Sequence, residues 1–306
     1  MTTQNMIQSN TELIEMADFV IKRVKENIYQ KIVVKTIKSF FLETSSTIIT
    51  KSITEAEEFG EPMKKESRYT TNEKIWFQSA TKINHLVFMY TSTENPANNY
   101  SKIEDILNGD EVLRKLDTVV GGEMIDINKM YTSPKFSKEF KNQMKRNLAE
   151  KTGITKEEII NEVSNKMFPI SLDKIWIKDK KMLYVGKADV GNLEADVLEI
   201  EINTAERRKY FFDSNTHLLV MITEEFYENG KSAKTTSYFS DYQSINELII
   251  AKKIITERET FDLREMEIKG KNIKMSNQSK VVTETVIEEF SINPQFAPEK
   301  FVIKEK

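Results

Sequence analysis

The second half of the chain alternates apolar and polar positions in short segments, a pattern typical of antiparallel strands. Between Arg207 and Glu257 each extended segment is closed by a turn signal. The segments are Tyr210–Phe212, His217–Tyr227, Thr235–Tyr242 and Leu248–Thr256. Asn229-Gly230 lies between the second and third, and Asn-Gly is the strongest short-range hairpin signal because a type I′ turn needs two positive φ angles. We therefore predict an antiparallel meander here, with further strands over 32–90 and after Leu172.

In three segments the apolar residues recur at the spacing of a helix, not of a strand. From Ser9 to Tyr29 apolar residues recur every three or four positions, which predicts an amphipathic helix. Such a stripe packs on its own domain or seats a partner helix. The pattern of residues 133–169 predicts a helical hairpin. Thr155 and Glu158 have the spacing of a capping box at the start of its second helix. This insert would be a packing lid on the sheet or a gate over a cavity. We also predict a short helix over Asp105–Val120 and a hairpin corner at Thr71–Glu73.

Composition narrows the class of protein. The 306 residues carry 45 Lys+Arg and 48 Asp+Glu, interspersed, for a net charge of -3, so no basic stripe favours nucleic acid. The absence of cysteine excludes disulfides and thiolate sites. No stretch approaches the roughly 18 apolar residues of a membrane span. The start has no signal-peptide pattern, which fits either a cytoplasmic protein or a mature form whose signal has been removed.

The sequence shows no reactive constellation. His85 and His217 have no ligand-spaced neighbours, and phosphate-loop, dinucleotide, zinc-protease and serine-hydrolase motifs are missing. Carboxylates alternate with apolar residues in strands such as Glu199-Ile200-Glu201, as on a solvated outer face. We predict no catalytic residue, no metal site and no cofactor, and hence a protein that is not an enzyme.

Aromatic residues are concentrated on the predicted strands, and some strands are apolar on both faces. The segment after His217 is Leu-Leu-Val-Met-Ile. A sheet with two apolar faces must be covered twice, by helices, by another sheet or by a ligand. Helix cover and a half-open barrel that holds an acyl chain are both compatible with this pattern.

Three motifs, in order, resemble the LolA-like superfamily of outer-membrane lipoprotein carriers and lipoprotein-sorting proteins. Leu183–Leu198 (LYVGKADVGNLEADVL) is similar to that family's YxGKxxVxGxxAxVL strands, and Tyr210–Leu219 (YFFDSNTHLL) to its YFDxxTGLL hairpin. Tyr238–Ile250 (YFSDYQSINELII) resembles its xFSDYxxVDGxxxP segment. His217 stands where the family has a turn glycine, Asn246-Glu247 replaces Asp-Gly, and Ala251 replaces a proline, as in a divergent member.

The resemblance implies a single LolA-like domain over residues 1–306 with the 133–169 helical insert. Its fold would be mainly β with helices (α+β): a curved, incomplete antiparallel β-barrel with helices over its open side. The apolar cavity would bind a lipid or the acyl chains of a lipoprotein, as a periplasmic carrier or accessory protein, or one anchored on the periplasmic side of a membrane, with a possible membrane-associated protein partner. The alternative is a structural or protein-interaction module, a sensor or assembly subunit, whose cavity is filled. The expected lining residues are Trp76, Phe88, Trp176, Tyr184, Tyr210, Phe212, Val220 and Tyr238.

Overall fold

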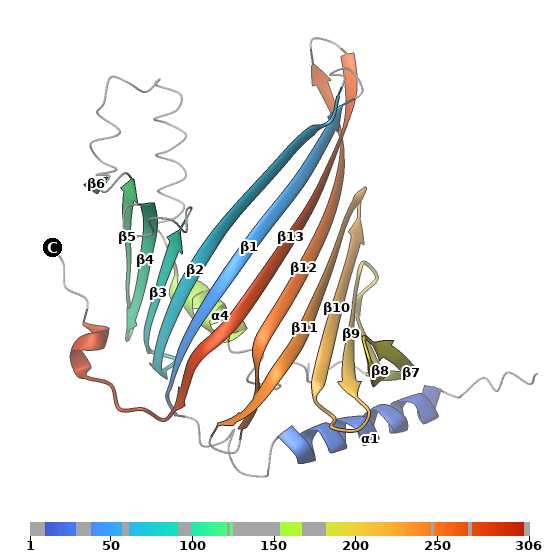
Figure 1. Ribbon diagram of the computed structural model, residues 1–306, viewed down its shortest axis with the longest axis horizontal. Coiled ribbons are helices and arrows are strands. Elements are labelled where there is room, and N and C mark those ends of the chain that lie inside the picture. Colours follow the sequence, from blue (N-terminus) through green and yellow to red (C-terminus); the bar gives the residue numbers. More distant parts are fainter. Residues whose placement is uncertain are drawn as a thin grey trace, which may run out of the picture. The chain divides into compact units, whose positions relative to one another are not determined.

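The computed structural model describes residues 10–28, 38–56, 61–90, 99–120, 123–124, 154–166, 182–245, 248–268 and 271–302. These residues form mainly β-strands that pair antiparallel (Figure 1). The sheet has 13 strands in the order β6-β5-β4-β3-β2-β1-β13-β12-β11-β10-β9-β8-β7. Among the described residues β6 and β7 are its edges, so the sheet is open. The predicted mainly β, antiparallel, unclosed sheet with helices is confirmed, and its barrel-like curvature remains a prediction.

The chain divides into two compact units. Unit 1 comprises residues 1–35, 49–67 and 172–284, and unit 2 comprises residues 36–48, 68–171 and 285–306. Unit 1 holds the predicted meander, and unit 2 holds most of the N-terminal strands. The single domain over the whole chain stays a prediction.

The meander of unit 1 is confirmed. Its strands are β7 (Leu183–Val190), β8 (Leu193–Asn203), β9 (Glu206–Asp213), β10 (Leu219–Glu228), β11 (Lys231–Ile245) and β12 (Leu248–Ile268). Asn229 and Gly230 have φ of 49° and 74°, the two positive angles that a type I′ turn requires, and Glu228 pairs with Lys231 to close the hairpin. Strand β12 continues past the predicted end at Thr256 to Ile268.

Strands β8, β9 and β10 are apolar on both faces. Tyr210 lies opposite Leu198 and Ile222 in the register, whereas Phe211 lies opposite Val197 and Met221. Because side chains alternate along a strand, these rows point to opposite sides, which we call the Tyr210 face and the Phe211 face. The buried residues include members of both rows: Leu198, Tyr210 and Ile222 on one face, and Val197 and Phe211 on the other. The two-sided apolar pattern predicted from sequence is therefore present.

The N-terminal helix is confirmed as α1 (Asn10–Ile28), which packs against β7. Its fully buried residues are Ala17, Val20 and Val24, spaced by three and four positions. This spacing places them on one side of the helix, as the stripe predicted. The helix therefore packs on its own unit.

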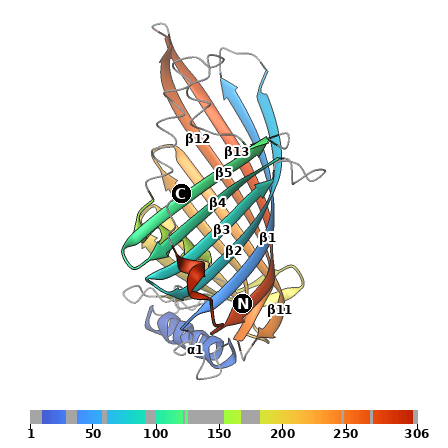
Figure 2. The same cartoon turned by 90° about the vertical axis from the view of Figure 1, so that its left-hand side faces the viewer.

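Unit 2 contains the N-terminal strands of the sheet and two short described helices. Its elements include parts of β1 (Phe40–Ala56), β2 (Met63–Ser79) and β13 (Lys271–Ile292), together with β3 (Lys82–Tyr90), β4 (Asn99–Asn108), β5 (Glu111–Val120), β6 (Glu123–Met124), α4 (Lys156–Lys166) and η3 (Pro298–Phe301). Figure 2 shows β2, β3, β4 and β5 side by side. Buried Ile75, Ile83 and Leu107 form part of its core, and the Phe40 ring stacks on Phe77 with centroids 4.8 Å apart.

Two predictions in unit 2 are wrong. Residues 105–120 form the β4–β5 hairpin and no helix, with Asn108 paired to Glu111 across Gly109-Asp110. Gly109 has φ 69°, so the Asn-Gly-Asp segment is the turn, and the three- and four-residue spacing of Val112, Leu113 and Leu116 is incidental. The corner expected at Thr71–Glu73 lies inside β2, because these residues continue the pairing with β3.

The second helix of the predicted insert is confirmed as α4, and the first lies outside the described residues. The Thr155 backbone N–H donates to Glu158 Oε2 at 2.7 Å, and the Glu158 backbone N–H donates to Thr155 Oγ1 at 3.2 Å. These reciprocal bonds are the predicted capping box, and they hold the pKa of Glu158 below its usual range. No helix among the described residues is long and apolar enough to cross a membrane.

Candidate functional site

The Tyr210 face of unit 1 carries Tyr184, Tyr210 and Phe212. Tyr184 on β7 lies opposite Leu198, which puts its side chain on this face. Its hydroxyl donates to Asp196 Oδ1 at 3.0 Å. Burial and this bond to a carboxylate raise the pKa of Tyr184 to about 12, so the hydroxyl remains a donor at neutral pH. Phe212 and Tyr210 are fully buried on the same face.

The turn between β9 and β10 brings His217 to this region. Asp213 Oδ1 accepts hydrogen bonds from the backbone N–H of Asn215 at 2.7 Å and of Thr216 at 2.8 Å. The backbone N–H of His217 donates to the Asp213 carbonyl at 2.8 Å, and His217 has φ 55°. A positive φ is the reason why glycine suits this position, where the LolA-like motif has one. Histidine accepts backbone strain there and adds an imidazole.

A pocket of about 640 Å³ opens between α1, β7, β8 and this turn, and we call it the α1 pocket. Its lining residues are Glu12, Glu15, Met16, Phe19, Val20, Tyr184, Lys187, Asp196, Ser214 and His217. Phe19 is 59% exposed and Met16 37% exposed, so both present apolar surface at the pocket. Ser214 Oγ and His217 Nδ1 are buried atoms without a hydrogen-bond partner among the described residues. The α1 pocket thus combines an apolar wall with unused polar atoms, as an amphipathic ligand requires.

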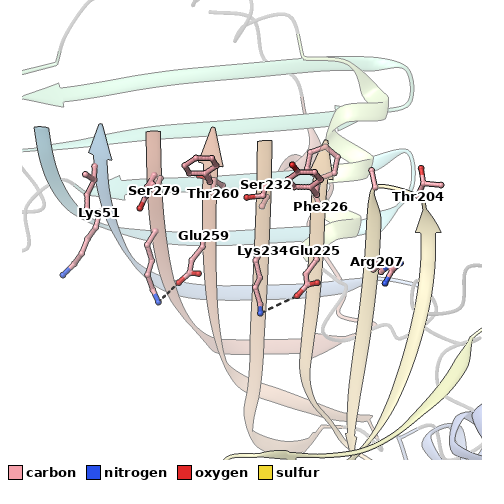
Figure 3. A pocket seen from close by; sticks show the side chains of 17 residues that line it. Lys51, Thr204, Arg207, Glu225, Phe226, Ser232, Lys234, Glu259, Thr260 and Ser279 are labelled. Atoms are coloured by element: carbon pink, nitrogen blue, oxygen red, sulfur yellow. Dashed lines mark hydrogen bonds and ion pairs between the residues drawn. The ribbon is translucent and has the colours of Figure 1, made fainter. Parts of the chain in front are cut away.

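A second concavity of about 790 Å³, the charged groove, lies over β9 to β13 and the adjacent strand β1 (Figure 3). Four side chains whose charges alternate in sign lie opposite one another on four successive strands, on the Phe211 face. They are Arg207, Glu225, Lys234 and Glu259. Lys234 Nζ lies 3.5 Å from Glu225, and Lys280 Nζ lies 3.1 Å from Glu259. Tyr227, 70% exposed, is among the aromatic residues that line the groove.

Within unit 1, the predicted lining residues lie on both faces of the sheet. Tyr184, Tyr210 and Phe212 share the Tyr210 face, and of these only Tyr184 lines the α1 pocket. Val220 packs in a cluster with Phe211, and Tyr238, 40% exposed, pairs with Met221, so both belong to the Phe211 face. Trp76 on β2 and Phe88 on β3 are partly buried in unit 2, where Lys300 Nζ lies 3.3 Å from the Trp76 ring centroid. Trp176 lies outside the described residues.

Several residues of the α1 pocket were not selected from the sequence. Phe19 lies off the apolar stripe of α1, and an aromatic residue on the polar side of an amphipathic helix was the signal available. His217 also carried a signal, because it replaces the turn glycine of the motif. Ser214 has none, since serine is common in turns.

Comparisons with known proteins return low similarity. No protein-family model matches the sequence, and no curated protein is significantly similar to it. Among solved structures, the chain is similar to a DUF1329 family protein from Desulfovibrio piger at 10% identity and a TM-score of 0.36, covering 95% of this chain and 97% of that chain.

Two further solved structures are also similar to this chain at low identity. A LolA superfamily protein from Nitrosomonas europaea has 12% identity and a TM-score of 0.34, with 94% of this chain and 97% of that chain covered. The Pseudomonas aeruginosa MucA/MucB complex matches at 7% identity and a TM-score of 0.20, over 92% of this chain and 100% of that chain. Likenesses at this level assign neither a ligand nor a function to this chain.

Proposed function

We propose that this protein binds the acyl chain of a lipid or lipoprotein in the α1 pocket, without catalysis and without a cofactor. One observation carries the proposal: α1 presents exposed Phe19 and Met16 at a pocket whose other wall includes Tyr184. The resemblance of the same strands to motifs of the LolA-like lipoprotein carriers supports the proposal. On this proposal the sheet curves as an incomplete barrel, α1 covers it, and the protein works in the periplasm or anchored on that side of a membrane.

The size and chemistry of the pocket suit such a ligand. Ligand pockets commonly enclose about 300–1,000 Å³, and the α1 pocket falls within this range at about 640 Å³. Each methylene taken out of water contributes about 0.8 kcal/mol, and a single myristoyl chain binds membranes with an association constant of about 10⁴ M⁻¹. Apolar contact alone therefore gives a dissociation constant of roughly 100 µM. Hydrogen bonds between the ligand's polar end and Ser214 Oγ or His217 Nδ1 would lower this dissociation constant.

The decisive test is binding of a fluorescent fatty acid to delipidated protein, compared between two surface variants. Phe19→Ser removes the exposed aromatic at the α1 pocket, and Tyr227→Ser removes an exposed aromatic of the charged groove as a matched control. Burying the exposed part of Phe19 contributes about 1–2 kcal/mol, so Phe19→Ser weakens binding roughly 5- to 30-fold. Tyr227→Ser leaves binding unchanged.

The proposal is refuted when wild-type protein binds no fatty acid and yields no lipid on extraction and mass spectrometry. It is also refuted when the two variants bind alike, because binding then occurs away from the α1 pocket. Unlabelled fatty acid competes with the probe when binding is specific.

A protein-interaction role is the second candidate, and the charged groove favours it. Exposed Tyr227 beside paired charges resembles the mixed aromatic and charged surfaces of protein interfaces. A stoichiometric partner that co-purifies with wild type and is lost in Lys234→Glu would support this role. Fatty-acid binding that survives Lys234→Glu would show that the two sites are independent.

A further inference from the structure

A group of ionisable side chains in unit 2 includes none of the residues that line the two concavities, and we call it the His85 cluster. It consists of Glu73 on β2, His85 on β3, Asp105 on β4, Arg114 on β5 and Glu162 on α4. His85 pairs with Asp105 in the register, and Asp105 pairs with Arg114, so three adjacent strands bring these side chains to one face. His85 and Asp105 are each only 1% exposed.

The ring of His85 is oriented by a carboxylate. Its Nε2 lies 2.5 Å from Glu73 Oε1, and Thr44 Oγ1 donates to Glu73 Oε2 at 3.5 Å. When Nε2 donates its proton to Glu73, the other nitrogen, Nδ1, carries a free lone pair. Nδ1 is buried and has no hydrogen-bond partner among the described residues. A histidine held by a carboxylate through one nitrogen, with the other available, is the usual arrangement of a metal ligand.

Two carboxylates complete a set of ligands around this histidine. A ring nitrogen of His85, a carboxylate oxygen of Asp105 and one of Glu162 lie within 4.8 Å of one another. Glu162 is held over the strands because Ile159 and Val163 of α4 are buried. Lys156 Nζ also binds Asp110 Oδ1 at 2.6 Å, which fixes the start of α4 to the β4–β5 turn.

Arg114 contacts two of the carboxylates of the cluster. Its guanidinium donates from Nε and Nη2 to the two oxygens of Asp105, each at 2.6 Å, and lies 4.0 Å from Glu162. Each carboxylate oxygen has two lone pairs, so Asp105 can contact Arg114 and a divalent cation together.

We propose that His85 Nδ1, Asp105 and Glu162 bind one divalent first-row transition-metal ion, and that Glu73 positions the His85 ring. One imidazole and two carboxylates suit Zn²⁺, whereas Mg²⁺ and Ca²⁺ prefer oxygen ligands only. The bound ion would join α4 to the sheet of unit 2. The sequence predicted no metal site because the three ligands, at positions 85, 105 and 162, have no characteristic spacing.

Zinc binding to the full chain tests this inference, because the protein has only two histidines. After dialysis against a chelator, ZnCl₂ is titrated by calorimetry and by long-range ¹H–¹⁵N spectra of ¹⁵N-histidine-labelled protein. We expect one zinc per chain and a displaced Nδ1 resonance of His85, with His217 unchanged as the internal reference. Excess MgCl₂ does not reproduce the displacement.

Variants separate ligation from general stability. Glu162→Gln, on the partly exposed side of α4, weakens zinc binding at least tenfold, whereas its matched control on the same helix, Glu157→Gln, binds like wild type. Glu73→Gln weakens binding about 10- to 100-fold by releasing the ring. The inference is overturned when zinc does not saturate at one per chain, when only His217 responds, or when Glu162→Gln binds as tightly as Glu157→Gln.

Discussion

Replacing His217 by glycine should stabilise the protein, because the turn between β9 and β10 forces this residue to φ 55°. A left-handed conformation costs a residue with a side chain about 1–2 kcal/mol. Glycine avoids this cost but loses about 0.5–1 kcal/mol through its greater freedom in the unfolded chain. The balance predicts a gain of about 0.5–1 kcal/mol for His217→Gly.

Two further variants isolate the backbone contribution. His217→Ala removes the imidazole but keeps the positive φ, so it should be about 1 kcal/mol less stable than His217→Gly. Asn229→Gly is the matched control at φ 49°, where asparagine already tolerates the left-handed region and the change should stay within roughly 0.5 kcal/mol. Urea unfolding followed by circular dichroism measures each difference. At about 1–3 kcal/mol/M, 1 kcal/mol moves the midpoint by roughly 0.3–1 M.

A His217→Gly variant less stable than His217→Ala would refute this prediction, because backbone strain at position 217 would then not limit stability. A more stable glycine variant with weaker fatty-acid binding would show that the imidazole serves the α1 pocket at a cost in stability. Equal binding would limit its role to the turn.

Two other predictions concern buried polar groups. The pKa of Tyr184 is raised from 10.0 to about 12, so its contribution to stability is complete below pH 10 and is lost as the pH rises to 12. In urea titrations across this pH range, wild type should therefore lose stability more steeply than Tyr184→Phe. Arg114→Ala leaves buried Asp105 without its bidentate partner and should cost about 3–5 kcal/mol in chelator-treated protein. The double variant Asp105→Asn/Arg114→Met should recover most of that loss, and an equal loss in both would contradict the charge argument.

Local chemistry was sufficient to predict the meander of unit 1. Asn229-Gly230 fixes its turn through two positive φ angles, and the flanking β-rich segments need only to pair with their neighbours. Residues 105–120 show the limit of periodicity, since Val112, Leu113 and Leu116 also suit a helix. The turn at Gly109 decided the outcome, and its Asn-Gly signal was present in the sequence. Thr71–Glu73 looked like a corner, but pairing with β3 keeps that segment extended.

The sites depend on contacts between distant segments, which sequence patterns do not encode. Tyr184 was selected as an aromatic strand residue, but its neighbour Phe19 comes from a helix about 165 positions earlier. The His85 cluster is assembled by the registers of β3 with β4 and β4 with β5, and Glu162 arrives from α4. Each of these residues alone resembles an ordinary strand or surface residue. Only the pairing of the strands gives them a common location.

The alternating charges of the charged groove also bear on how the strands find their partners during folding. A shift of one residue between β10 and β11 would turn apolar side chains to the wrong face, and the lost apolar burial excludes this alignment. A shift of two residues keeps every side chain on its own face, so apolar burial distinguishes this alignment poorly from the native one. Such a shift would separate Glu225 from Lys234, and likewise Lys234 from Glu259 one strand further on. Although each exposed pair contributes little to stability, the row as a whole selects one alignment among those that the apolar pattern permits.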